Sequence, residues 1–176
     1  ARDALVAFDR VIALDPALRF IPFDPLDFRD WLLADLIEMG RPNDALRILD
    51  ALGEESALPP RLLHHLGRIR YLEGSPSRAE SAWSLAVALD PNLAGPWRGL
   101  GELAAARGDA ERAATCFEKA AALDPNDPST FYQWSLLERR RGRLERAGWL
   151  KAKADALREG RKPSQAGMSE MPAESR

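Results

Sequence analysis

The sequence has very little cysteine, little histidine and no long hydrophobic run. Cys116 is the one cysteine among 176 residues, so an intrachain disulfide and a cysteine-based metal site are both excluded. No stretch approaches the roughly 18 consecutive apolar residues of a membrane span, and the start, Ala1-Arg2-Asp3, does not resemble a signal peptide. We therefore expect a soluble chain without a membrane span, in either the cytoplasm or the periplasm.

The sequence also lacks the motifs of the common enzyme classes. It contains no G-x-S-x-G, Walker A, H-E-x-x-H or Gly-rich dinucleotide motif. Its two histidines, His64 and His65, are adjacent, and neighbouring residues on a helix point about 100° apart. No third ligand follows at a metal-binding spacing, and no base is placed to activate Cys116, which we interpret as a small apolar residue. We expect no enzymatic activity, no metal and no cofactor.

Charge is distributed unevenly along the chain. The net charge is -2, but residues 1–59 hold 12 acids and 6 bases, a net of -6, and residues 128–176 hold 6 acids and 11 bases, a net of +5. The basic run 139–143 spreads around two predicted helices, so we favour solvated helix ends over a nucleic-acid site. The two ends of the chain therefore favour different neighbours. Arginine outnumbers lysine, which is typical of a GC-rich bacterial genome.

What the sequence does contain is a period of 34 residues. Glycine recurs at Gly40, Gly74, Gly108 and Gly142, and alanine follows each glycine by five residues at Ala45, Ala79, Ala113 and Ala147. A fixed period of this length is typical of stacked helical hairpins, in which each unit buries its apolar face against its neighbours. The period predicts repeats at 26–59, 60–93, 94–127 and 128–159.

The third repeat is the clearest. The residues Trp97, Leu100, Gly101, Ala113, Phe117, Ala120 and Pro125 match the pattern W-x2-L-G, A-x3-F and then P. In this pattern the chain resembles the tetratricopeptide repeat family, and the second repeat follows it with Gly67 and Trp83. Leu33 and Ser135 replace the small glycine in the first and fourth repeats. Small residues at Gly101, Ala113 and Ala120 are expected to let the two helices of a repeat nearly touch, while Trp97, Leu100 and Phe117 fill the space between repeats.

The residues that begin and end helices follow the same register. We predict first (A) helices at 26–39, 60–73, 94–107 and 128–141, and second (B) helices at 43–52, 76–89, 110–123 and 144–159. Gly74, Gly108 and Gly142 lie just past the A helices, where a left-handed residue closes the last turn, and Ser75 and Asp109 suit the caps that open B helices. No β-hairpin signal competes. The predicted fold is all-α: a right-handed superhelical solenoid of antiparallel helix pairs, with four repeats and an N-terminal half-repeat.

The two ends depart from the regular pattern. Residues 1–16 reproduce the second half of a repeat and predict an orphan helix, followed by an apolar, proline-containing connection at 17–25. Charged residues, among them Arg146 and Lys151, make the last B helix polar enough to face water. Trp149 is the exception, because an exposed tryptophan there indicates a partner or self-association. Residues 160–176 lack apolar periodicity and are predicted to be disordered.

The resemblance implies a concave face, lined by A helices, that grips a peptide or a partner helix. Its groove positions are the second, fifth, ninth and twelfth of each repeat, which share one helical face. The predicted groove residues are Arg61, His64, Arg68, Tyr71, Arg98, Glu102, Tyr132 and Arg139. The guanidinium groups of the four arginines in this set would hold carboxylates of an acidic peptide. The alternative is that these residues form an ordinary solvated face.

These observations predict a noncatalytic scaffold that binds a protein or peptide partner and not nucleic acid. Two alternatives stay open. In the first, the chain is the repeat region of a larger enzyme or cell-envelope assembly protein, in which it positions a catalytic domain. In the second, the chain forms a structural homo-oligomer through its end helices.

Overall fold

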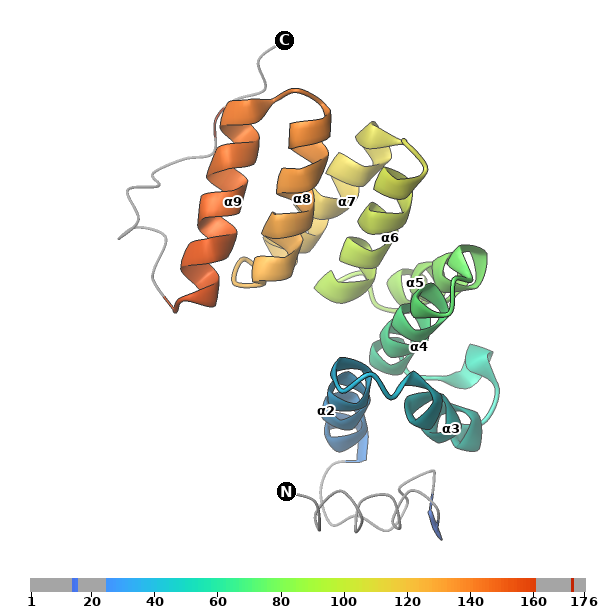
Figure 1. Cartoon of the computed structure of the whole chain (residues 1–176). Coiled ribbons are helices and arrows are strands. Elements are labelled where there is room, and N and C mark those ends of the chain that lie inside the picture. Colours follow the sequence, from blue (N-terminus) through green and yellow to red (C-terminus); the bar gives the residue numbers. More distant parts are fainter. Residues whose placement is uncertain (1–13, 16–24, 161–171, 173–176) are drawn as a thin grey trace. The chain divides into compact units, whose positions relative to one another are not determined.

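The computed structural model describes residues 14–15, 25–160 and 172, and the helices with described bounds lie within 25–160 (Figure 1). They are α2 (Pro25–Glu38), α3 (Pro42–Leu52), α4 (Pro60–Leu72), α5 (Pro76–Leu89), α6 (Ala94–Ala106), α7 (Ala110–Leu123), α8 (Pro128–Arg140) and α9 (Leu144–Arg158), with a short 3-10 helix η1 (Glu55–Ala57) between α3 and α4. No strand occurs in this described part. Most of the predicted orphan helix, connection and C-terminal tail lies outside it.

The helix bounds agree with the sequence predictions to within one residue at either end. The left-handed closure predicted at Gly74, Gly108 and Gly142 is confirmed, and Gly40 closes α2 in the same way, because all four φ angles are positive, from 71° at Gly40 to 83° at Gly108. The residue after each glycine donates its backbone N–H to a carbonyl of the preceding helix, as Ser75 does to Arg70 at 2.9 Å. Within 25–160, no helix is both long and apolar enough to cross a bilayer.

One of the two predicted caps is correct. The Asp109 side chain accepts a hydrogen bond from the backbone N–H of Arg112 at 3.1 Å and caps α7. The Ser75 side chain forms no such bond at the start of α5. The residue that follows it, Pro76, has a fixed φ angle already suited to the first helical position and carries no N–H to satisfy.

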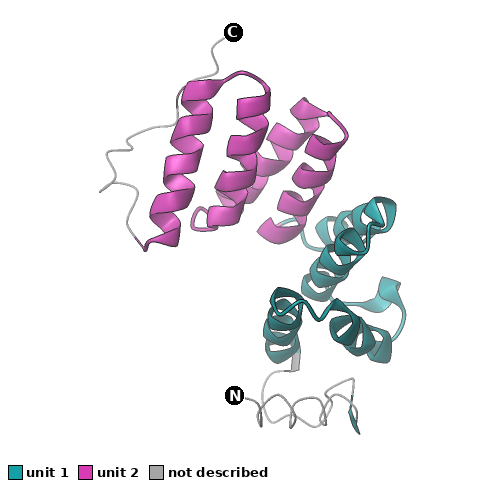
Figure 2. Ribbon diagram, viewed as in Figure 1, with its two compact units in different colours: residues 1–91 teal, residues 92–176 magenta. Residues whose placement is uncertain are grey.

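The chain divides into two compact units, Ala1–Pro91 and Asn92–Arg176, which are coloured separately in Figure 2. In the described part of the first unit, α2 packs against α3 and α4, and α4 pairs with α5. In the second unit, α6 pairs with α7 and α8 with α9, while α7 also packs against α8. Each unit has its own apolar core, centred on Leu33, Leu63 and Leu66 in the first and on Phe117, Trp134 and Leu150 in the second.

Two glycines allow the helices of a pair to approach closely. A Cβ atom added to Gly67 would lie 2.3 Å from Nε1 of Trp83, and one added to Gly101 would lie 2.8 Å from Cε1 of Phe117. Trp83 also donates Nε1–H to the carbonyl oxygen of His64 at 3.1 Å. Glycine on the A helix therefore accommodates an aromatic ring from the B helix of the same pair. The ring of Phe117, predicted to fill the space between repeats, also packs on Gly101 within its own repeat.

Candidate functional site

Half of the predicted groove residues lie on one helix of the first unit, α4. Arg61 forms an ion pair with Asp27 of α2, with 2.6 Å between Nη1 and Oδ1, and both side chains remain largely exposed. His64 and Arg68 are half-buried. The Tyr71 ring is 38% exposed and contacts Trp83, with 5.9 Å between the ring centroids. The structure therefore places these four residues along one partly exposed face of α4.

His65, next to the predicted groove residue His64, has a structural role that the sequence did not reveal. Its buried Nε2 lies 2.8 Å from Oδ1 of Asp30 and links α4 to α2. The hydrogen bond with His65 is the main cause that lowers the pKa of Asp30, against the opposing effect of burial. His65 thus helps to hold α2 and α4 together. No group of three metal-ligating side chains occurs among the residues that the structure describes.

In the second unit, Arg98 and Glu102 are engaged within the fold. Arg98 binds Asp127 at 2.7 Å through Nη1 and lies 3.6 Å from Glu102 through Nε. Asp127 caps α8, accepting from the backbone N–H groups of Ser129 and Thr130. Burial acts to raise the pKa of Asp127, but the charge of Arg98 and these hydrogen bonds outweigh it and lower the pKa. This cluster fastens α6 to the start of α8.

The lowered pKa of Asp127 predicts a loss of stability in acid. A carboxylate with a depressed folded-state pKa stabilises the protein fully above its unfolded pKa of about 3.9, and loses this contribution as the pH falls through the folded value. We expect the free energy of unfolding to fall more steeply between about pH 5 and pH 3 in the wild type than in Asp127→Asn, which keeps a capping side chain without the charge. Urea unfolding at both pH values measures the difference, and equal slopes would contradict this role for Asp127.

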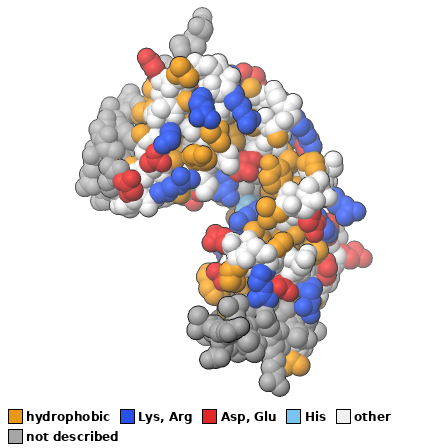
Figure 3. Space-filling view, in the orientation of Figure 1, with side chains coloured by type: hydrophobic (Ala, Val, Ile, Leu, Met, Phe, Trp, Pro, Cys, Tyr) orange, Lys and Arg blue, Asp and Glu red, His pale blue; other side chains and the backbone are white. Residues whose placement is uncertain are grey.

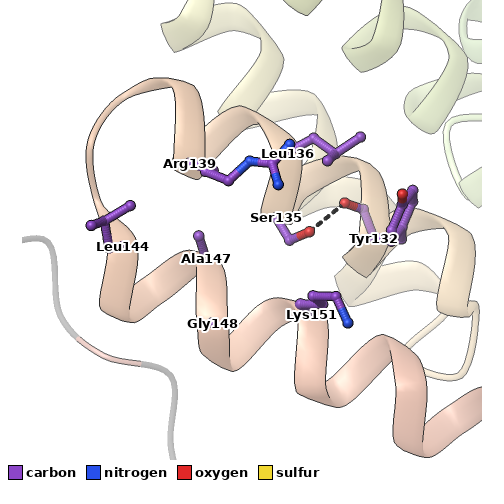
Figure 4. Close-up of a pocket in the computed structure, with 8 residues that line it drawn as sticks. All are labelled: Tyr132, Ser135, Leu136, Arg139, Leu144, Ala147, Gly148 and Lys151. Carbon is purple, nitrogen blue, oxygen red and sulfur yellow. Dashed lines mark hydrogen bonds between the residues drawn. The ribbon is translucent and has the colours of Figure 1, made fainter.

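The remaining two predicted groove residues line a pocket between α8 and α9 with a volume of about 280 Å³ (Figure 4). It is lined by Tyr132, Ser135, Leu136 and Arg139 from α8 and by Leu144, Ala147, Gly148 and Lys151 from α9. The Ser135 hydroxyl donates to the carbonyl oxygen of Tyr132 at 2.7 Å. Lys151 pairs with Asp155 at 2.6 Å, whereas the exposed Arg139 side chain forms no ion pair within the described residues.

The repeat register explains why a pocket exists at this place. Ser135 and Lys151 correspond, 34 residues later, to Gly101 and Phe117, the pair in which a ring packs on a glycine. Lys151 turns toward Asp155 instead of filling the space beside Ser135. The substitutions were visible in the sequence, and comparing all four repeats position by position would have predicted the pocket.

A buried carboxylate at the α8–α9 turn was missed. Glu138 is completely buried and accepts a hydrogen bond from Nε1 of Trp134 at 3.3 Å. Its two oxygens also lie 3.5 Å from Arg141 and 3.4 Å from Arg143. The interpretation of the run 139–143 as solvated is therefore wrong for Arg141 and Arg143, because they neutralise this buried charge.

Two further expectations for α9 need correction. The prediction that Arg146 faces water is wrong. Its side chain is buried, where it pairs with Glu118 at 3.3 Å and lies over the Trp134 ring at 5.1 Å. Trp149 was the candidate for an exposed contact, yet it is half-buried against the second core. Cys116 is also buried, and burial raises the pKa of its thiol, which disfavours the reactive thiolate.

Comparisons with known proteins agree with the fold. Residues 94–127 match the family model described as the tetratricopeptide repeat. A crystal structure of MamA is 21% identical, with coverage of 89% of this chain and 88% of that chain and a TM-score of 0.60. The structure of YrrB, described as a TPR protein with an unusual peptide-binding site, is 19% identical, with coverage of 90% and 78% and a TM-score of 0.54. No curated protein matches.

Proposed function

We propose that this chain, a tetratricopeptide-repeat protein, is a noncatalytic scaffold that binds a partner protein through the exposed faces of its A helices. The observation that carries the proposal is the division of α4 into two faces. Leu62, Leu63, Leu66 and Ile69 are buried in the core, whereas Arg61 and Tyr71 are exposed and His64 and Arg68 half-exposed. The peptide-binding site described for YrrB supports a function of the same kind.

The chemistry of these faces favours a partner segment with carboxylates. Arg68 on α4 and Arg139 on α8 offer planar guanidinium groups that bind carboxylates with two parallel hydrogen bonds. Tyr71 and Tyr132 provide rigid apolar surface beside them. Arg98 pairs with both Glu102 and Asp127, so this cluster positions the helices and contributes little charge to the partner.

Charge reversal on the two A helices tests the proposal. We expect Arg68→Glu with Arg139→Glu to reduce capture of the partner from a cell lysate by more than about tenfold, because each charged hydrogen bond is worth about 1.5–3 kcal/mol. Arg98 is unsuitable for this test, since reversing its charge would also disturb Asp127 and the cap of α8.

The matched control is Arg78→Glu, which changes an exposed arginine on the B helix α5. Quantitative mass spectrometry of the captured proteins should show that the control retains what the wild type retains. Helical circular dichroism should be unchanged in both variants. If the double variant captures the same proteins in the same amounts as the wild type, the A-helix faces are not the binding surface.

A further inference from the structure

The surface that surrounds the α8–α9 pocket has a covered counterpart in the preceding helix pair. On α6 and α7, the residues Ala105, Ala110, Ala114 and Phe117 pack in one core with Phe131, Tyr132 and Trp134 of α8. The same register 34 residues later gives Arg139, Leu144, Gly148 and Lys151, which we call the α8/α9 surface. On the preceding pair, therefore, the equivalent surface of α6 and α7 is covered by the next A helix, α8.

The α8/α9 surface is open and combines apolar groups with positive charge. Leu144 is 67% exposed, and a Cβ atom added to Gly148 would meet no atom within 4 Å. Arg139 and Lys151 flank these residues (Figure 4), and basic side chains lie among hydrophobic ones on the second unit (Figure 3). The volume of about 280 Å³ lies below the roughly 300–1,000 Å³ of small-molecule sites. It suits one bulky side chain better than a small-molecule ligand.

The first described A helix, α2, carries a face of complementary chemistry. Asp27, Trp31, Asp35 and Glu38 are spaced by four, four and three residues, which places them on one side of the helix. Trp31 is 60% exposed, while Leu32, Leu33 and Leu36 are buried in the core of the first unit. An exposed tryptophan surrounded by carboxylates has the composition of a binding anchor.

We propose that α2 of a second copy of this chain docks on the α8/α9 surface, with Trp31 in the pocket and the carboxylates of Asp35 and Glu38 facing Arg139. The docked element is an A helix, like the α8 helix that covers α6 and α7. The net charges of -6 for residues 1–59 and +5 for residues 128–176 attract each other. The two surfaces differ, so the contact is head to tail. Each bound copy then leaves one surface of each kind available for a further copy.

Sedimentation velocity over a concentration series tests the association. The wild type is expected to form species larger than the monomer as concentration rises, and to dissociate as salt screens the charges. Trp31→Lys, which blocks the α2 face, and Arg139→Glu with Leu144→Glu, which blocks the α8/α9 surface, should each raise the dissociation constant at least about 30-fold. Leu89→Glu is the control, because Leu89 is an exposed leucine on α5, outside both surfaces.

Mixing the two blocked variants makes the test specific. Each keeps the surface that the other lacks, so the mixture is expected to give a one-to-one heterodimer and no larger species, which also shows that both variants are folded. A wild type that is monomeric at every concentration would overturn the proposal, as would undiminished association of either blocked variant. A mixture that stays monomeric while the wild type associates would also overturn it.

Discussion

Replacing Glu138 with alanine is expected to lower the free energy of unfolding by about 3–5 kcal/mol, because removing one partner of a buried ion pair leaves the other charge uncompensated. Glu138 is fully buried and receives Trp134 Nε1–H, with Arg141 and Arg143 beside its oxygens. The substitution would leave both guanidinium groups and the indole N–H without this acceptor. Urea unfolding followed by circular dichroism measures the loss.

Glu111→Ala is the matched control for this substitution. Glu111 pairs with the same arginine, Arg141, but its side chain is 85% exposed. An exposed ion pair is worth less than about 1 kcal/mol, so the control should unfold almost like the wild type. Equal losses in the two variants would contradict the assignment of Glu138 as the buried centre of the network.

Replacing Gly67 with alanine is expected to lower the free energy of unfolding by about 2 kcal/mol. The added methyl group would lie 2.3 Å from Nε1 of Trp83, and the indole ring cannot retreat easily because it is buried and hydrogen-bonded to the carbonyl of His64. Overpacking of this kind costs about 3 kcal/mol at the upper end of its usual range. The better helix propensity of alanine offsets roughly 1 kcal/mol of this cost.

Gly148→Ala is the control, and its expected effect has the opposite sign. Gly148 is also a helical glycine, but a Cβ atom there meets nothing within 4 Å. The substitution should therefore stabilise the protein by about 0.5–1 kcal/mol. Thermal unfolding of both variants compares them directly. If Gly67→Ala is as stable as Gly148→Ala, the A and B helices of the second pair do not approach as closely as the structure indicates.

The helices were predictable because the sequence repeats its packing residues. Gly67 and Gly101 share one position of the repeat, and the rings that contact them, Trp83 and Phe117, share another, so a close approach of the two helices could be predicted from the sequence. The left-handed glycines marked the helix ends for a similar reason, since few other residues adopt that conformation at low cost. The residue type at each position therefore determined both the close helix contacts and the helix ends.

The polar interior was not predictable by the same reasoning. Glu138 and Arg146 are charged residues of the kind that usually face water on a helix surface. Their burial depends on partners such as Arg143 and Glu118. Side chains from neighbouring helices reach these residues only after the pairs have packed. The engagement of Arg98 with Asp127 escaped prediction for the same reason: Asp127 lies 29 residues away in the sequence. The assignment of the eight groove residues as a binding surface stays a prediction.

Hydrogen–deuterium exchange of the wild type, with and without its captured partner, measures whether partners bind on the A-helix faces. We expect slower exchange in peptides from α4 and α8, with little change in α5 and α7. Protection confined to the B helices α5 and α7, with α4 and α8 unchanged, would contradict it.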